Sequence, residues 1–268
     1  MNLGKQLRMS RIVRSDTQRS LIVAYAHGVL MGPLPGMATQ AQMDVQARSL
    51  RGADAVIVPP GVVRFVPSLF EGRDAPALMI LARWQNISRT SEQLGYRAGS
   101  TAALASIEKV AALGAVGIMN YLYIGFEDSR EEAREIEAAV KVGEECDRFG
   151  LVHLVETRAV RDERNSDGSY KLDLIQLHTR IAAEIGADLI KTKQPATVSE
   201  VRELTDACPC PVLFAGGPLR ANPDDAYRTA ADAIEGGAAG LVFGRNIFQQ
   251  PDPAAALAKF SSIVHGRQ

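Results

Sequence analysis

The sequence has no excess of charge of either sign and no long apolar run. It contains 30 Lys and Arg against 31 Asp and Glu, which gives a formal net charge of −1. Nucleic-acid-binding proteins usually carry a strong basic excess, so we expect no nucleic-acid partner. No apolar run approaches the ~18 residues that a membrane span requires. We therefore expect no membrane partner either.

Cysteine and histidine are also scarce. Three Cys in 268 residues exclude a disulfide scaffold, and their odd number favours a reducing compartment, which predicts a cytoplasmic protein. Cys208 and Cys210 do not form a CxxC motif, and the four His are scattered without the spacing of metal ligands. The sequence therefore predicts no metal site, and we expect no other cofactor.

Short apolar runs, each followed by a helical or irregular segment, are what the sequence has in abundance. Because almost every residue in these runs is apolar, they are typical of strands buried on both faces of a parallel sheet. The runs cover residues 21–25, 54–58, 77–81, 116–122, 151–155, 188–191, 212–215 and 240–243, and helices are expected over 38–50, 101–113, 129–148, 172–185, 198–207, 223–235 and 253–264.

Eight such units without a linker predict an α/β fold, a closed (β/α)8 TIM barrel. An open doubly wound sheet would need a glycine fingerprint after its first strand, and residues 26–32 have the wrong spacing for one. We therefore expect residues 1–268 to form a single barrel domain. The basic start lacks the apolar core of a signal peptide, and about residues 1–20 are expected to be an N-terminal cap rather than a transit peptide.

Lys191 is the most informative polar residue at a predicted strand end, where barrel enzymes carry their active sites. Alternation along the strand places Leu189, Lys191 and Lys193 on one face. Burial in the barrel mouth and a second cation two residues away should both lower the pKa of Lys191, and a neutral amine is what a Schiff-base nucleophile requires. Spacing alone leaves open a structural ion pair with Glu156 instead.

Two glycine-bearing loops follow the last two predicted strands. Gly216 and Gly217 come after the seventh strand, and Gly244 with Arg245 comes after the eighth. TIM barrels commonly bind phosphate between these two loops, because backbone without side chains lets N–H groups approach the anion. A lone Gly-Gly is often only a tight turn, but both loops in these two places predict a phosphate site, with Arg245 as a forked donor.

Further polar side chains fall at the same end of the predicted barrel. The candidates for proton transfer are His27, Tyr123 and Glu156, and Lys193 and Arg158 are expected as further residues of the mouth.

Seven short stretches together carry a resemblance to a known family: residues 27–28, 32–33, 123–125, 180–184, 186–192, 215–218 and 244–249. Over about residues 8–265 the sequence resembles the DeoC/FbaB-type class I aldolases. Within that family it is similar to archaeal-type fructose-bisphosphate aldolases, aminodideoxyheptulosonate synthases and autoinducer-2 phosphate thiolases. The resemblance implies that Lys191 is the Schiff-base lysine, that the two glycine loops hold the phosphate of a small keto substrate, and that no metal takes part. It also implies a homo-oligomer, since many such proteins form rings of ten subunits.

The sequence departs from the family pattern at points that bear on the reaction. Ala26 stands where the family usually has an Asp before His-Gly, and Glu156 or Thr157 stands near the position of a usual Tyr. These changes point to a specialised substrate or to another proton-transfer group. An aldol reaction, a thiolase-like acyl transfer on a phosphorylated diketone, and a phosphosugar-binding protein without chemistry all remain open.

Overall fold

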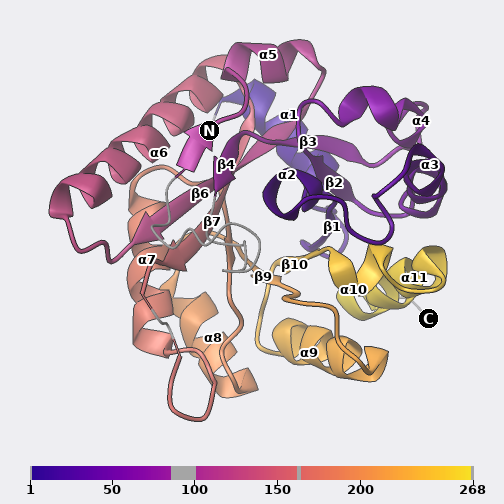
Figure 1. Ribbon diagram of the computed structural model, residues 1–268. Helices are drawn as coiled ribbons and strands as arrows, with labels where there is room; N and C mark the ends of the chain where they lie inside the picture. Colours follow the sequence, from indigo (N-terminus) through magenta and orange to yellow (C-terminus); the bar gives the residue numbers. More distant parts are fainter. Residues whose placement is uncertain (1, 86–100, 162–163, 267–268) are drawn as a thin grey trace.

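Eight parallel strands form a closed barrel in the computed structural model, which describes residues 2–85, 101–161 and 164–266 (Figure 1). Each strand pairs with its neighbours in the chain, and β1 pairs with β10 to close the ring. The strands are β1 (Ser20–Ala24), β2 (Ala55–Val58), β3 (Ala77–Leu81), β6 (Gly117–Ile124), β7 (Val152–Ala159), β8 (Leu189–Thr192), β9 (Val212–Ala215) and β10 (Gly240–Phe243). The predicted (β/α)8 barrel is confirmed.

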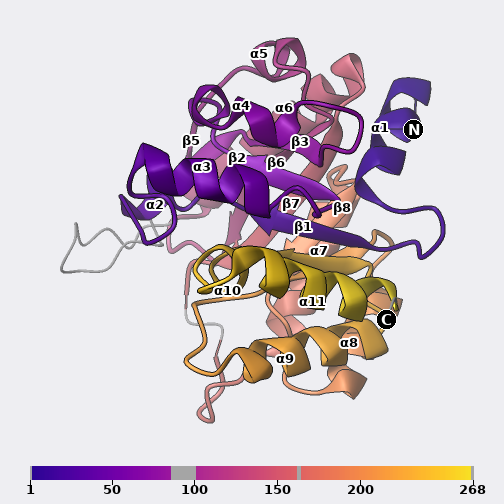
Figure 2. The ribbon, with the colours of Figure 1, turned by 90° about the vertical axis from the view of Figure 1, so that its right-hand side faces the viewer.

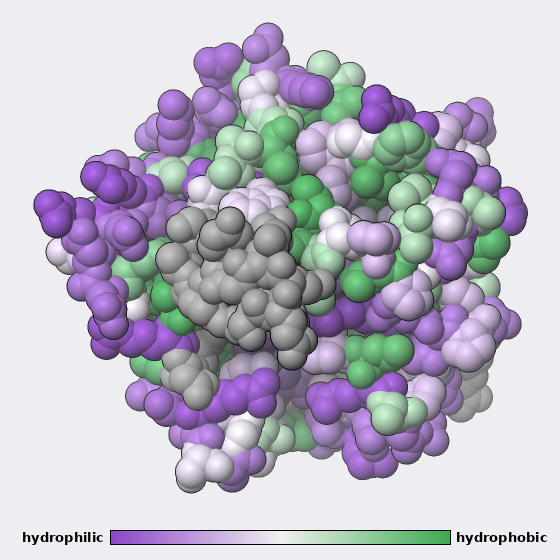
Figure 3. All heavy atoms as spheres, viewed as in Figure 1, coloured by the Kyte–Doolittle hydropathy of each residue, from purple (hydrophilic) through white to green (hydrophobic). Residues whose placement is uncertain are grey.

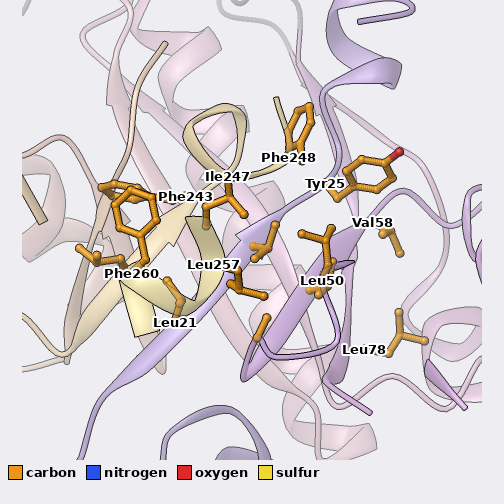
Figure 4. Close-up of a cluster of buried hydrophobic side chains, with 14 of the residues drawn as sticks. Leu21, Tyr25, Leu50, Val58, Leu78, Phe243, Ile247, Phe248, Leu257 and Phe260 are labelled. Carbon is orange, nitrogen blue, oxygen red and sulfur yellow. The ribbon is translucent and has the colours of Figure 1, made fainter. Parts of the chain in front are cut away.

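Alternate side chains of each strand point into and out of the barrel. Leu21 and Val23 of β1 belong to the apolar layer under the helices, whereas Ile22 and Ala24 belong to the cluster inside the barrel. The outer layer includes large residues from both ends of the chain, such as Leu50 and Phe260 (Figure 4). Burial on both faces explains why the strands read as continuous apolar runs.

Helices surround the barrel and, apart from α5, begin close to where the sequence predicts them. The longer ones are α3 (Gln40–Ser49), α5 (Ile107–Ala112), α6 (Ser129–Phe149), α7 (Leu172–Glu184), α8 (Val198–Ala207), α9 (Pro223–Glu235) and α11 (Pro253–His265), and short ones are α2 (Gly28–Met31), the 3-10 turn η1 (Val63–Phe65), α4 (Pro67–Phe70) and α10 (Arg245–Phe248). Hydrophilic residues cover the outward side of α6, at the left of Figure 3. None of the described helices is both long and apolar enough to cross a membrane.

The N-terminal helix α1 (Leu3–Ile12) closes the end of the barrel opposite α2 (Figure 2). Ile12 is fully buried in the cluster inside the barrel. The buried Lys5 donates to Asp147 and lies 2.9 Å from a carboxylate oxygen of Asp188, which precedes β8. Buried charges are stable only when paired, so these contacts fix α1 under the barrel.

A two-stranded hairpin replaces the predicted start of the helix at residue 101. β4 (Arg83–Gln85) pairs antiparallel with β5 (Thr101–Ala103), and α5 begins only at Ile107. The Thr101 hydroxyl donates to the buried carboxylate of Glu135 on α6, at 2.7 Å, and thereby holds β5 in place. The prediction was wrong here because this long-range contact overrides the local helical pattern. Residues 86–100, between β4 and β5, lie outside the described residues.

Candidate active site

Lys191 projects from β8 into the barrel and is 7% exposed. It aligns with Glu156 of the neighbouring strand β7, and its Nζ donates to Glu156 Oε2 at 2.6 Å. Burial lowers the pKa of Lys191, nearby Arg158 and Arg245 lower it further, and Glu156 opposes them. The predicted inward orientation is confirmed, and the structure combines the two readings of the sequence: a lysine of lowered pKa that also pairs with Glu156.

Glu156 joins Lys191 to a second cation. Arg158 donates to Glu156 Oε1 from Nη2 at 2.6 Å and from Nε at 2.9 Å, while Oε2 accepts from Lys191. Burial alone would raise the pKa of Glu156, but Lys191 and Arg158 hold that pKa well below its usual range. The carboxylate therefore stays ionised and orients the amine.

The two glycine loops lie beside this lysine and require glycine for steric reasons. A Cβ on Gly216 would lie 2.7 Å from the Phe243 ring, and one on Gly244 would lie 2.6 Å from the Ala24 carbonyl oxygen. Gly217 has φ +69°, a conformation that side chains disfavour. A side chain would thus clash at Gly216 and Gly244 and would strain the backbone at Gly217.

Asn246 fixes the glycine loops relative to each other, a role that the sequence analysis missed. Its side-chain amide donates to the carbonyl oxygens of Gly216 at 2.9 Å and Pro218 at 3.0 Å, and its Oδ1 accepts from the Arg220 N–H. The adjacent Arg245 begins α10, and burial, followed by the nearby Arg158, lowers its pKa. An anion between the loops would stabilise the charged form of Arg245.

His27 follows β1 at the same end of the barrel. Its ring packs against Phe248, with 5.5 Å between the ring centroids. Burial, then the positive charges of Arg245 and Lys191, lower the pKa of His27 to about 3. The imidazole is therefore neutral at physiological pH.

Tyr123 and Tyr121 are stacked on the inner side of β6, with ring centroids 6.1 Å apart. Tyr121 lines the cavity in front of Lys191, whereas Tyr123 is fully buried and is not part of the cavity wall. The sequence analysis named Tyr123, and not Tyr121, as a candidate for proton transfer. Alternation puts both on one face, so only the packing distinguishes them.

The residues predicted for the site, apart from Tyr123, line one cavity of about 290 Å³ at the mouth of the barrel. A second cavity of about 510 Å³ adjoins it and shares part of its wall, including Lys193, Gly216 and Gly217. Lys193 Nζ lies 5.5 Å from the centroid of the Tyr170 ring, at this junction. The predicted residues that line the first cavity are His27, Glu156, Arg158, Lys191, Lys193, Gly216, Gly217, Gly244 and Arg245.

Residues 2–85, 101–161 and 164–266 contain no group of three or more His, Cys, Asp or Glu that could hold a metal ion. The wall of the described cavity offers an amine, a paired carboxylate, a neutral imidazole, a phenol and two glycine loops.

A model of the family described as DeoC/LacD family aldolase matches residues 20–250. The chain belongs to this family. The resemblance inferred from the sequence is thus confirmed, and the protein is an enzyme of the aldolase class. In this chain Lys191 lies near the end of β8, the sixth barrel strand in chain order.

Three relatives match nearly the whole chain. An uncharacterized aldolase of Saccharolobus solfataricus is 28% identical over 98% of this chain and 95% of its own. A 3-hydroxy-5-phosphonooxypentane-2,4-dione thiolase of Yersinia pestis is 30% identical over 99% of this chain and 84% of its own. A 2-amino-4,5-dihydroxy-6-oxo-7-(phosphonooxy)heptanoate synthase of Streptomyces griseus is 28% identical over 98% and 90%.

The fold matches a solved archaeal fructose-1,6-bisphosphate aldolase whose catalytic Lys is covalently bound to the carbinolamine intermediate of the substrate. The TM-score is 0.81, with 23% identity over 98% of this chain and all of that chain. At this identity the comparison supports the TIM barrel rather than an activity.

Proposed function

We propose that the protein is a class I aldolase that makes or breaks a carbon–carbon bond of a phosphorylated keto substrate through an imine on Lys191. The observation that carries the proposal is the buried Lys191 amine, whose pKa burial lowers, held 2.6 Å from Glu156 in the cavity at the barrel mouth. A neutral amine attacks a carbonyl, and the resulting iminium accepts the electron pair of the breaking bond.

We place the substrate phosphate between the Gly216–Gly217 loop and Gly244–Arg245. Backbone N–H groups at glycines can approach phosphate oxygens closely, and Arg245 adds charge-assisted donors. The Nε of Arg245 is buried without a hydrogen-bond partner among the described residues, which supports an anionic ligand at this point. The phosphorylated compounds in the names of the Yersinia and Streptomyces relatives agree with this assignment.

The proposed roles of the other groups follow from their charge states. Glu156 orients the Lys191 amine, and the neutral His27, whose pKa is about 3, accepts hydrogen bonds or transient protons near the substrate. Arg158 and Lys193 supply positive charge around it. Ala26 supplies neither donor nor acceptor, which favours a substrate other than fructose bisphosphate.

Thiolase-like acyl transfer on a phosphorylated diketone is the second candidate reaction. The observation that favours it is the 30% identity to the Yersinia thiolase over 99% of this chain. Both reactions begin with the same Lys191 imine, so they differ only in which carbon–carbon bond breaks and what accepts the fragment.

Reduction by borohydride in the presence of dihydroxyacetone phosphate, a small phosphorylated ketone, tests the proposal. The intact mass should rise by the mass of one ligand less one oxygen atom, because imine formation releases water and reduction adds two hydrogens. Lys191→Met should abolish the increase while its circular dichroism stays unchanged. Absence of an adduct with this ketone and with phosphorylated diketones would instead favour a phosphosugar-binding barrel without chemistry.

We further propose a cytoplasmic homo-oligomer. Three free cysteines, with Cys146 buried, suit a reducing compartment. Leu3 and Leu7 on α1 are 68% and 62% exposed, and such side chains suit burial against a second copy. Multi-angle light scattering that gives a mass of 28.8 kDa would contradict the oligomer.

A further inference from the structure

The Tyr121 hydroxyl lies in the same layer of the barrel as the reactive amine. Tyr121 on β6 aligns with Glu156 on β7, which aligns in turn with Lys191 on β8. All three side chains line the same cavity, and Tyr121 is only 2% exposed. A ligand bound covalently to Lys191 therefore has this phenol two strands away, on the far side of Glu156.

Two neighbouring groups of the cavity wall, Glu156 and His27, carry no excess proton to donate at neutral pH. Both oxygens of Glu156 accept from cations, and its pKa is held low, so it carries no proton. His27, with a pKa of about 3, is not protonated either. Burial and then the Glu156 charge raise the pKa of Tyr121 well above 10, so its phenol keeps the proton.

Two neighbouring side chains, Gln85 and Tyr123, contact the Tyr121 side chain. Gln85 is fully buried at the end of β4, and its side chain is hydrogen-bonded to that of Tyr121. The Tyr123 ring stacks on Tyr121 with 27° between the planes. The ring of Tyr121 is thus fixed by a hydrogen bond and by a stacking contact. A fixed donor loses little conformational freedom when it engages a substrate.

We propose that Tyr121 donates the proton that lets the carbinolamine hydroxyl on Lys191 leave as water, and that Gln85 is the positioning residue for this step. The inference rests on the imine of the proposed function. The carbon–oxygen bond breaks, the hydroxyl takes the phenol proton, and the nitrogen lone pair forms the C=N bond. The iminium and the phenolate then form a charge pair. When water later hydrolyses the imine, it returns one proton to the phenolate.

The rate of adduct formation tests this step separately from the imine itself. With dihydroxyacetone phosphate and cyanoborohydride, followed by intact mass, Tyr121→Phe should slow adduct formation by about 10²-fold or more, because general acid catalysis contributes that much. At long reaction times Tyr121→Phe should form as much adduct as the unmodified protein does. The matched control is Tyr227→Phe, since Tyr227 packs on Phe260 at α9 outside the cavity, and it should react at the original rate.

A double substitution distinguishes positioning from a general structural effect. Gln85→Leu should slow adduct formation by itself and add nothing in the Tyr121→Phe background, since both changes remove the same step. An unchanged rate in Tyr121→Phe, a loss confined to Tyr123→Phe, or additive losses with Gln85→Leu would overturn the proposal. If the unmodified protein forms no adduct at all, it is the proposed function that fails.

Discussion

Replacing Glu156 by Gln removes the negative charge that pairs with both the buried Lys191 and the half-buried Arg158. In the unmodified protein Lys191 and Arg158 each lie 2.6 Å from a different oxygen of this carboxylate. The substitution keeps the size of the side chain, but both cations lose their common partner. Opposite charges ~4 Å apart attract by about 4 kcal/mol at an effective dielectric constant near 20. The Gln amide restores about 1 kcal/mol as a neutral hydrogen bond. Because two cations lose this partner, we expect the free energy of unfolding to fall by about 3–5 kcal/mol, the range for removing one partner of a buried ion pair.

The same substitution should move the pH dependence of imine formation toward acid. Glu156 is the group that raises the pKa of Lys191 against burial, so without it that pKa falls further. Losing about 1.4 kcal/mol of stabilisation of the charged amine lowers the pKa of that amine by one unit. The pH at which imine formation reaches half its maximal rate, called the midpoint below, should therefore fall by roughly one to two units. Below the present midpoint the variant should thus form the imine faster than the unmodified protein, although its turnover falls because the amine is less well oriented.

Two assays with one control check both effects. Urea denaturation gives the free energy of unfolding, and the rate of cyanoborohydride trapping with dihydroxyacetone phosphate across pH gives the midpoint. Glu184→Gln is the matched control, because Glu184 pairs with Arg180 on the surface and its side chain is 62% exposed. That control should change stability by less than about 1 kcal/mol and leave the midpoint in place. A midpoint that stays or rises in Glu156→Gln would refute the role given to this carboxylate.

Two other predictions concern the phosphate site and acid stability. Arg245→Ala removes a charge-assisted pair, so calorimetry should show dihydroxyacetone phosphate binding weakened by about 1.5–3 kcal/mol. Binding of dihydroxyacetone, which lacks the phosphate, should stay nearly unchanged. Equal losses for both ligands would show that Arg245 has a structural role instead. Burial lowers the pKa of His153 from 6.5 to about 4, so between these values only the unfolded chain binds the proton. Stability should therefore fall by about 2 kcal/mol from this residue between pH 7 and ~pH 5. Urea denaturation of His153→Gln should show a smaller fall, and an identical fall would contradict the reasoning.

The barrel was predictable because each strand is buried on both faces and so reads as an apolar run in the sequence. Lys191 was predictable for the same reason. It interrupts such a run at an inward position, where Leu189 belongs to the barrel interior. The bare glycines after β9 and β10 mark places where a Cβ would meet Phe243 or Ala24.

The missed features depend on contacts between residues far apart in the chain. Thr101 begins a strand because its hydroxyl reaches Glu135, and no local pattern encodes that contact. Alternation along β6 could not separate Tyr121 from Tyr123, because both face inward and only the packing determines which one reaches the cavity. Asn246 lay within a recognised stretch, but its bonds to Gly216 and Pro218 appear only once the two loops are side by side.

The most direct test of the account is to locate the reduced adduct in the chain. The protein is treated with dihydroxyacetone phosphate and borohydride, digested, and its peptides are sequenced by mass spectrometry. The account predicts a single modified residue, Lys191, in the unmodified protein and none in Lys191→Met. Modification of Lys193 instead of Lys191, or an adduct that survives in Lys191→Met, would contradict it.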